Sequence, residues 1–223
     1  MENSLYNKTV ICPVCVKKIE VTKVKSKSCV IEKRDTDFCV YYETVNPLIY
    51  DVWVCEFCGY AAQGDKFENI SSSDANKIIK SITPYWKKRS FSGERTIEKG
   101  LEAFKLALYN LQKIKSKPSD YAKICIRIAW IFRILKDEKE KEFISYALKY
   151  YYEVYDKEDL PIGKFDKYTC MYMIAELNRR IGNYDESIVW FNRLITSNEA
   201  RSNKVLMESA REQYHIAKEQ KQS

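Results

Sequence analysis

The sequence predicts an α+β protein in two parts: a small β module held together by a metal ion, and an all-α domain of helical hairpins. Two observations carry this prediction. Two C-x-x-C pairs, Cys12–Cys15 and Cys55–Cys58, supply four thiolates that can converge on one ion. Near residue 70 the spacing of apolar residues changes from about 2, typical of strands, to about 3.6, typical of helices. We therefore expect a β module over residues 1–70 and a helical domain over residues 71–223.

Composition points to a compartment and excludes some classes of protein. The 223 residues include 6 glycines and 5 prolines, a scarcity that favours helix over most of the length. No apolar run approaches the roughly 18 residues that cross a bilayer, and the first residues lack the hydrophobic segment of a signal peptide. We expect a cytoplasmic protein that does not enter the membrane. In that reducing compartment eight cysteines favour metal or redox chemistry over disulfides.

Four segments of the β module have strand character. They either alternate apolar and polar side chains or are rich in β-branched and aromatic residues. Asn46 and Pro47 mark a turn before the last segment, which leads into the second cysteine pair. The expected strands cover residues 19–24, 29–32, 38–42 and 49–54.

A polar stretch from Ser71 to Asp74 separates the two parts and supplies a helix N-cap. About seven helices follow, with apolar residues at steps of three and four. Pro84 interrupts or restarts the first of them, and Pro118 opens the third. The helices, which we expect to pair as antiparallel hairpins, cover residues 77–89, 94–115, 118–135, 143–154, 166–180, 184–195 and 203–218.

The hairpin of residues 166–195 resembles the tetratricopeptide repeat. Small residues stand where two helices approach closely and a large aromatic fills the gap, in a pattern of Ala175, Gly182, Tyr184, Ser187, Phe191 and Leu194. Ser187 and Leu194 replace the usual alanines, Asn178 replaces an aromatic residue, and no proline closes the repeat. The resemblance implies a degenerate helical repeat whose concave face binds a peptide or protein.

The four cysteines predict one structural zinc ion. In a C-x-x-C turn both sulfurs reach the metal, and a following glycine, Gly59 in the second pair, permits the positive φ that the turn needs. Val16 takes that place in the first pair, so we expect the first turn to close differently. Iron is the less favoured alternative: thiolate spacing does not select zinc over iron, and Cys55-x-x-Cys58-Gly59-Tyr60 resembles a rubredoxin knuckle.

The remaining candidate ligands and nucleophiles have structural interpretations. Four further cysteines fall on expected strands or apolar helix faces and are predicted to be small core residues: Cys29, Cys39, Cys125 and Cys170. His215 is the only histidine and is expected on the surface of the last helix. The sequence contains no nucleophile elbow, P-loop or dinucleotide fingerprint, so nothing specifies catalysis.

A dense polar cluster in the β module is a candidate ligand pocket. Its members are Arg34, Asp35, Asp37, Asn46 and Tyr50. One interpretation is a turn in which the aspartates accept backbone N–H bonds and Arg34 pairs with one of them. The other is a pocket for a polar ligand or a peptide terminus.

Positive charge is concentrated outside the β module. Residues 1–70 carry 9 Lys or Arg against 10 Asp or Glu, whereas residues 71–120 carry 11 against 5. Within the second stretch, Lys87, Lys88 and Arg89 follow two aromatic residues and form a candidate basic patch for nucleic acid. The favoured interpretation is a solvated helix end, where cations complement the helix dipole.

Five short motifs stand out along the chain: Cys12-Pro13-x-Cys15, Arg34-Asp35-x-Asp37-Phe38, Asn46-Pro47-x2-Tyr50, Val54-Cys55-x-x-Cys58-Gly59-Tyr60-Ala61 and Ala129-Trp130-Ile131-Phe132-Arg133. Taken together, they resemble a bacterial family of uncharacterised proteins, the domain-of-unknown-function family 2225. The resemblance covers nearly the whole chain. It implies an N-terminal metal-binding module and a tetratricopeptide-like helical region in a bacterial cytosolic protein, and it implies no activity.

Three functional hypotheses follow. The first is a non-enzymatic adaptor with a zinc-stapled β module and a helical domain that binds a protein or peptide partner. The second is a nucleic-acid-binding protein that uses the basic stretch of residues 71–120. The third is a redox or iron protein that uses the four cysteines. We expect the protein not to be an enzyme.

Overall fold

The computed structural model describes residues 4–222 and confirms the α+β class. The chain divides into two compact units. The first unit comprises the residues up to Arg34 together with Val40–Ser116, and the second comprises Asp35–Cys39 together with the chain from Lys117 onward. The boundary expected near residue 70 marks the change from strands to helices but differs from this division, because the first two α-helices pack on the strands of the first unit.

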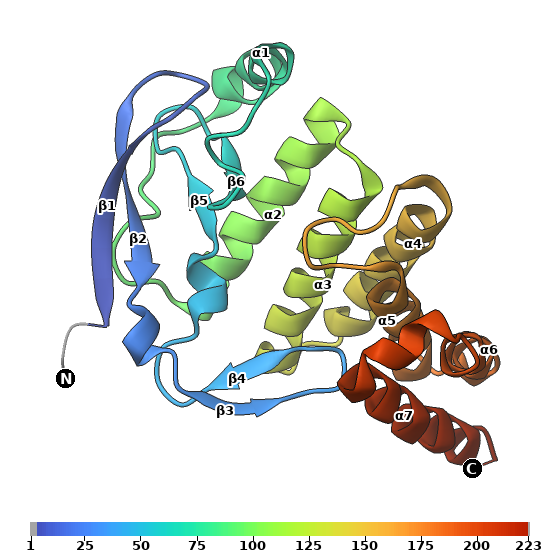
Figure 1. Ribbon diagram of the computed structural model, residues 1–223. Coiled ribbons are helices and arrows are strands. Elements are labelled where there is room, and N and C mark those ends of the chain that lie inside the picture. The colour runs from blue at the N-terminus through green and yellow to red at the C-terminus, as the bar shows by residue number, and fades with distance from the viewer. Residues whose placement is uncertain (1–3, 223) are drawn as a thin grey trace. The chain divides into compact units, whose positions relative to one another are not determined.

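Within its described part, the first unit contains three two-stranded antiparallel hairpins. In the longest, residue 10 pairs with residue 19, and both Val10 and Ile19 are buried. The sequence pattern does not predict β1. Four consecutive residues of this seven-residue strand are exposed, so buried and exposed side chains do not alternate along it. Figure 1 shows the strands: β1 (Leu5–Ile11) with β2 (Lys18–Val24), β3 (Ile31–Arg34) with β4 (Val40–Tyr42), and β5 (Val52–Val54) with β6 (Ala61–Gln63).

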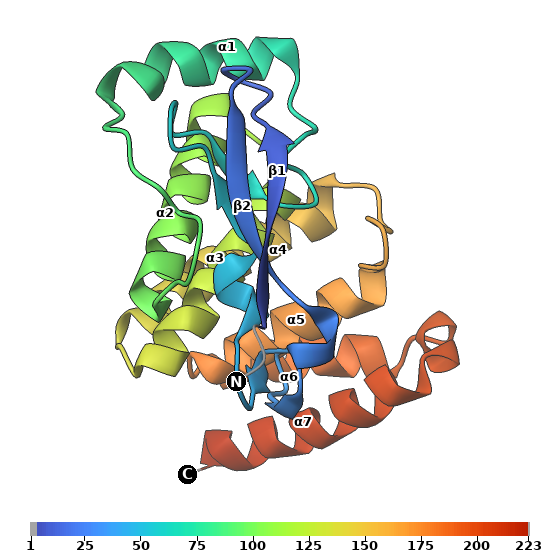
Figure 2. The ribbon, with the colours of Figure 1, turned by 90° about the vertical axis from the view of Figure 1, so that its left-hand side faces the viewer.

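Two α-helices complete the first unit. Helix α1 (Ser72–Ser81) begins at the expected cap, where the Ser71 hydroxyl accepts the backbone N–H of Asp74 at 3.1 Å. It ends well before residue 89, because Pro84 follows and the chain continues as a short 3-10 turn, η3 (Thr83–Tyr85). Helix α1 lies across the closed end of the β1–β2 hairpin (Figure 2), and α2 (Ile97–Ile114) packs on β5 and β6. Two further 3-10 turns, η1 (Ser26–Ser28) and η2 (Pro47–Tyr50), connect the hairpins.

The core of the first unit surrounds three of the four cysteines of the two C-x-x-C pairs. Strands β1, β2 and β5, the second cysteine turn and helix α1 each contribute to it. The buried residues are Val10, Cys12, Val14, Ile19, Val21, Trp53, Cys55, Cys58, Tyr60, Phe67, Ala75, Ile78 and Ile82. The cysteines therefore belong to the interior that holds this unit together.

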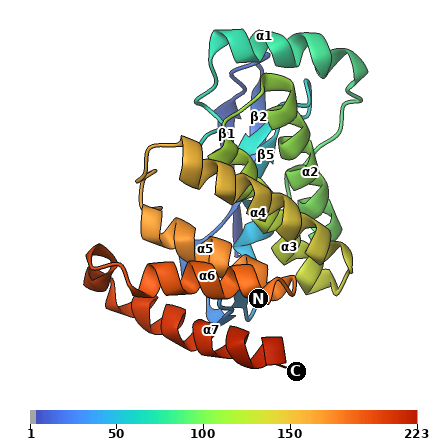
Figure 3. The same ribbon diagram turned by 90° about the vertical axis from the view of Figure 1, so that its right-hand side faces the viewer.

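The second unit is helical, and each α-helix packs against the next along the chain (Figure 3). Four of the six residues that carry the small and aromatic pattern of the α5–α6 hairpin are buried, namely Ala175, Ser187, Phe191 and Leu194, whereas Gly182 is exposed and Tyr184 is half-buried. Within residues 4–222, no helix combines the length and apolar character that a membrane crossing requires. The elements are α3 (Pro118–Leu135), α4 (Lys139–Lys157), α5 (Lys167–Arg180), α6 (Tyr184–Ile195), η4 (Glu199–Ser202) and α7 (Lys204–Gln222).

Candidate functional site

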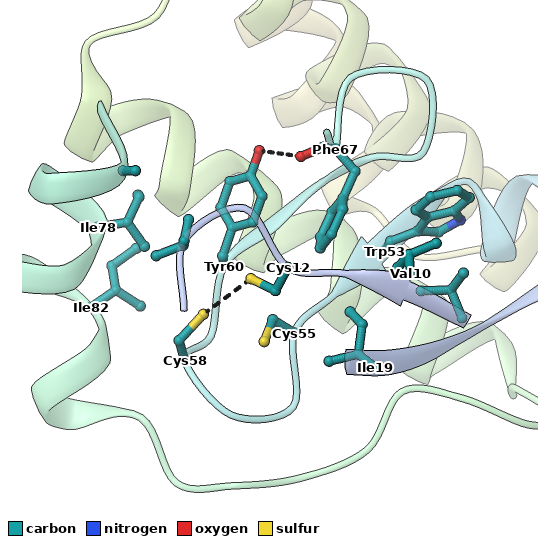
Figure 4. Packing of buried hydrophobic residues seen from close by; sticks show 13 residues of the cluster. Val10, Cys12, Ile19, Trp53, Cys55, Cys58, Tyr60, Phe67, Ile78 and Ile82 are labelled. Atoms are coloured by element: carbon teal, nitrogen blue, oxygen red, sulfur yellow. Dashed lines mark hydrogen bonds between the residues drawn. The ribbon is translucent and has the colours of Figure 1, made fainter. Parts of the chain in front are cut away.

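Four cysteine sulfurs converge in the first unit. The Sγ atoms of Cys12, Cys15, Cys55 and Cys58 all lie within 4.8 Å of one another. The Cys12–Cys58 pair is separated by 3.7 Å (Figure 4) and the Cys15–Cys55 pair by 3.5 Å. A disulfide needs about 2.0 Å, whereas zinc bonds of about 2.3 Å in a tetrahedron place their sulfurs about 3.8 Å apart. The spacing therefore fits a tetrathiolate metal site, and the donor set suits zinc or iron.

Three of the four cysteines of the cluster are buried. Cys12 and Cys55 are fully buried and Cys58 is 1% exposed, while Cys15 is half-buried. Tyr60 packs beside the sulfurs and donates its hydroxyl to the carbonyl of Phe67 at 3.1 Å (Figure 4). Four thiolate ligands fill a tetrahedral metal and leave no position for a substrate, which is the arrangement of a structural site.

Both cysteine turns have the same backbone conformation, so the expectation that the first closes differently is wrong. The N–H of Val16 donates to the carbonyl of Cys12 at 2.9 Å, and the N–H of Gly59 donates to the carbonyl of Cys55 at 3.0 Å. Val16 has a φ of 59° and Gly59 a φ of 76°. Glycine reaches this region freely, but a β-branched residue is strained in it. The turn that brings Cys12 and Cys15 together therefore holds valine in this conformation.

Replacing Val16 with glycine should stabilise the metal-loaded protein by about 1 kcal/mol. Relief of the strained φ contributes roughly 1 to 3 kcal/mol, and the larger entropy loss of glycine offsets about 0.5 to 1 kcal/mol of it. The Val16 side chain is 78% exposed, so little packing is lost. Denaturant unfolding at fixed zinc concentration measures the change. Gly59→Ala is the reverse substitution at the equivalent position of the second turn, and it should destabilise the protein because its Cβ would stand 2.7 Å from the Trp86 ring. A stabilised Gly59→Ala or a destabilised Val16→Gly would contradict this account.

Hydrogen bonds within the cluster distribute its protons unevenly. Thiols of Cys55 and Cys58 hydrogen-bond to the Cys12 sulfur and, with the backbone N–H groups of Cys15 and Val14, lower the pKa of Cys12. The same bonds to Cys12 raise the pKa of Cys55 and that of Cys58. A bound divalent cation would take the place of these thiol protons.

The predicted basic patch lies on the second cysteine turn and is not helical. The Lys88 ammonium lies 4.7 Å from the centre of the Phe57 ring, and Arg89 stacks on Trp86 at 4.5 Å. Arg89 also forms an ion pair with Glu102 at 2.7 Å, while Lys87 is exposed. The interpretation as a helix end is wrong, because the chain leaves η3 and the Trp86 indole N–H donates to the carbonyl of Glu56 at 2.7 Å. Nucleic-acid binding by this segment stays a prediction.

The five residues of the predicted ligand pocket belong to both units: Arg34, Asn46 and Tyr50 to the first, and Asp35 and Asp37 to the second. In the first unit, Asn46 caps η2 by accepting the N–H of Leu48 at 2.9 Å. The buried Tyr50 hydroxyl accepts the backbone N–H of Arg95 at 3.0 Å. Arg34 is exposed at the end of β3. Asn46 and Tyr50 therefore have structural partners.

Arg95 anchors the surroundings of Tyr50. Its side chain is 5% exposed and donates to the carbonyls of Ile49, Val52 and Phe91 at 2.8 to 2.9 Å. Burial lowers the pKa of the guanidinium to about 10. This contact cannot be predicted from a motif, because the arginine binds backbone carbonyls rather than an acidic side chain.

In the second unit, Asp37 is fully buried and bound to α3. Arg133 donates to both carboxylate oxygens of Asp37 at 2.9 and 2.6 Å, and the Trp130 indole N–H donates to it at 3.0 Å. Arg133 also donates to Asp35 at 2.8 Å, and Arg180 lies 3.4 Å from Asp37. The partners are thus arginines of α3 and α5, in place of the predicted pairing with Arg34. Sequence reasoning quoted Trp130 and Arg133 only as part of a family motif, and it missed Arg180.

A second buried carboxylate extends this network. Glu176 is fully buried on α5 and accepts from Arg179 at 2.7 and 2.8 Å and from Arg180 at 3.0 Å. The hydroxyl of Thr36 donates to Glu176 and accepts from Arg180 at 3.1 Å. Residues 35–39 are therefore bound through two buried acids and three arginines.

The other cysteines are confirmed as core residues, with one exception. Burial raises the pKa of Cys39, Cys125 and Cys170 to about 12, so these thiols stay protonated. Cys29 is only half-buried, and its thiol donates to the carbonyl of Lys25 at 3.7 Å. His215 is exposed on α7, as expected.

The fold and the cluster define a class: an α+β protein with a buried four-cysteine centre and a helical region. The chain belongs to the family described as "Uncharacterized protein conserved in bacteria (DUF2225)", whose model matches residues 5–217. This confirms the resemblance carried by the sequence motifs.

The chain is also similar to a curated protein. It is an uncharacterized protein of Borreliella burgdorferi, 29% identical over 123 residues, a match that covers 50% of this chain and 43% of the relative. The match thus spans less than half of the relative's own length. No solved structure matches the chain significantly.

Proposed function

We propose that this protein is a non-catalytic zinc-binding adaptor whose tetratricopeptide-like helical unit binds protein partners. The observation that supports it best is that α3 and α5 bind an acidic and aromatic peptide segment, residues 35–39, through side chains. Stacked helical hairpins form the concave surfaces with which such repeat proteins bind their partners. The segment here belongs to the same chain, and it displays the chemistry that the helices accept.

The metal centre supports the same proposal by its closed geometry. A buried tetrathiolate with no open position contributes folding free energy rather than reactivity. Lys17 and Lys88 lie 4.7 Å from the Phe57 ring, beside the second cysteine turn, where they offset the negative charge of a zinc tetrathiolate. In this proposal the first unit is a folded support and the helical unit makes the interaction.

Site-specific photo-cross-linking in the bacterium tests this function. The cross-linking residue replaces Tyr146 on α4 or Tyr6 on β1, which are exposed to similar extents, 45% and 42%. A third probe at Tyr85 lies two residues from Lys87. We expect discrete adducts with a partner protein from position 146 and few from position 6. Absence of protein adducts from α3–α7 positions would contradict the proposal, and nucleic-acid adducts from position 85 would support the basic-patch alternative.

A further inference from the structure

We propose that the site formed by Trp130, Arg133, Tyr172 and Arg180 recognises an Asp-x-Asp-Phe turn of a partner protein, and that residues 35–39 are its tethered internal counterpart. The inference rests on the proposed function and names the chemistry of the partner. It is carried by contacts within the second unit, to which residues 35–39 belong.

The bound segment is a self-contained turn. The N–H of Asp35 donates to the carbonyl of Cys39 at 2.8 Å, and the N–H of Phe38 donates to the carbonyl of Asp35 at 3.0 Å. These bonds close the turn with its own backbone. A partner that carries the same five residues can therefore present the same shape.

Arg133 and Tyr172 each contact two residues of the turn. Arg133 binds both carboxylate oxygens of Asp37, a bidentate geometry that distinguishes a carboxylate from an amide. The Tyr172 hydroxyl donates to the carbonyl of Thr36 at 2.9 Å, and its ring stacks on Phe38 with centroids 5.4 Å apart. Recognition of acidic motifs by clustered arginines is a recurrent mode of peptide binding.

The backbone of Phe38 is strained in a way that serves this recognition. Its φ is 69°, a conformation that glycine or asparagine adopts more easily than an aromatic residue. Phenylalanine supplies the ring that stacks on Tyr172. Strain of this kind persists where the surrounding contacts over-determine it, and it is concentrated at functional sites.

The internal segment is tethered by a hairpin that is itself weakly built. Strand β3 is exposed at all four residues, and the three residues of β4 are half-buried. A short two-stranded hairpin of this kind is marginally stable alone. The site also reaches solvent at its edge, because Asp35 is 24% exposed and Arg180 18% exposed. A tethered segment acts at an effective concentration of the order of mM. A partner turn competes with the segment at that concentration for the same site.

Binding of a synthetic peptide to the full-length chain tests the inference. The probe is a fluorescent peptide of residues 31–42 with Cys39→Ser, titrated by anisotropy. The wild type is compared with Asp35→Asn/Asp37→Asn and with Phe38→Ala, which weaken the internal segment through charge and through stacking. We expect both variants to bind the probe at least about ten-fold more tightly than the wild type, because their site is open for a larger fraction of the time. Adding Arg180→Gln to either variant should reverse the gain.

The inference is overturned if variants that keep their helical circular dichroism bind the probe no better than the wild type does. It is also overturned if a probe with Asp37→Asn binds as tightly as the unchanged probe. Where a variant loses helicity, the readout becomes thermal stabilisation by saturating probe, and no stabilisation also counts against the site. If photo-cross-linking finds a partner on α3–α7 but the peptide does not bind, the adaptor function stands and this recognition site does not.

Discussion

Removing the metal should unfold the first unit and leave the helical signal of α3–α7 largely intact. The core of the first unit is built around Cys12, Cys55 and Cys58, which are buried and whose sulfurs hydrogen-bond within the cluster and to backbone N–H groups. Binding of a structural zinc ion supplies on the order of 10 kcal/mol of apparent free energy to a module of this kind. Titration with a chelator is followed by tryptophan fluorescence, to which Trp53 and Trp86 of the first unit contribute beside Trp130 and Trp190 of the second, and by far-ultraviolet circular dichroism for the helices. Elemental analysis should find one zinc per chain.

Cysteine variants distinguish the cysteines that bind the metal from the other cysteines. Cys55→Ser removes a fully buried ligand. The variant should no longer contain one zinc per chain, and its tryptophan fluorescence should match that of the chelator-treated protein. Cys29→Ser is the matched control, because Cys29 lies outside the cluster and its thiol donates to the carbonyl of Lys25. A coloured protein that contains one iron per chain would show that the four cysteines bind iron instead of zinc. A Cys55→Ser protein that kept both its metal and its fold would overturn the structural role.

The cysteine centre could be predicted because its information is local. Two C-x-x-C turns each place a pair of sulfurs together, and only their convergence depends on the fold. The glycine after the second pair has the expected positive φ, but the valine after the first pair adopts it too. Sequence rules rate the preference of an isolated residue, whereas here the four sulfurs together with the bond from the Val16 N–H to Cys12 set the backbone.

The network around Asp37 could not be predicted because its partners are remote in sequence. Asp37 and Arg133 are 96 residues apart, and no periodicity or spacing rule connects them. The acidic cluster was recognised as unusual, but a turn that satisfies its own carboxylates and a turn bound by distant arginines have the same local sequence. The division at Ser116 was missed for the same reason, since α1 and α2 have ordinary helical patterns and only their packing assigns them to the strands.

Replacing Asp37 with asparagine should destabilise the protein by roughly 3 kcal/mol, the cost of breaking a buried ion pair by removing one partner. Arg133 would keep Asp35 at 2.8 Å and Glu140 at 2.7 Å but would lose its bidentate partner. Denaturant unfolding of the zinc-loaded protein measures the loss. Asp185→Asn is the control in the same unit: Asp185 is 81% exposed in its ion pair with Lys221, and we expect no measurable change.

The same variant should also change how stability depends on pH. Burial opposes ionisation of Asp37, but hydrogen bonds from Arg133 and the charge of Arg180 outweigh it, so the pKa is lowered from its ordinary value of 3.8. Below that value the unfolded chain binds a proton that the folded chain still excludes, so stability falls with decreasing pH until the folded pKa is passed. The contribution is fully present above about pH 4. The difference between wild type and Asp37→Asn should therefore shrink below that pH, and a difference that stayed constant into acid would mean that Asp37 is not held as a carboxylate by these arginines.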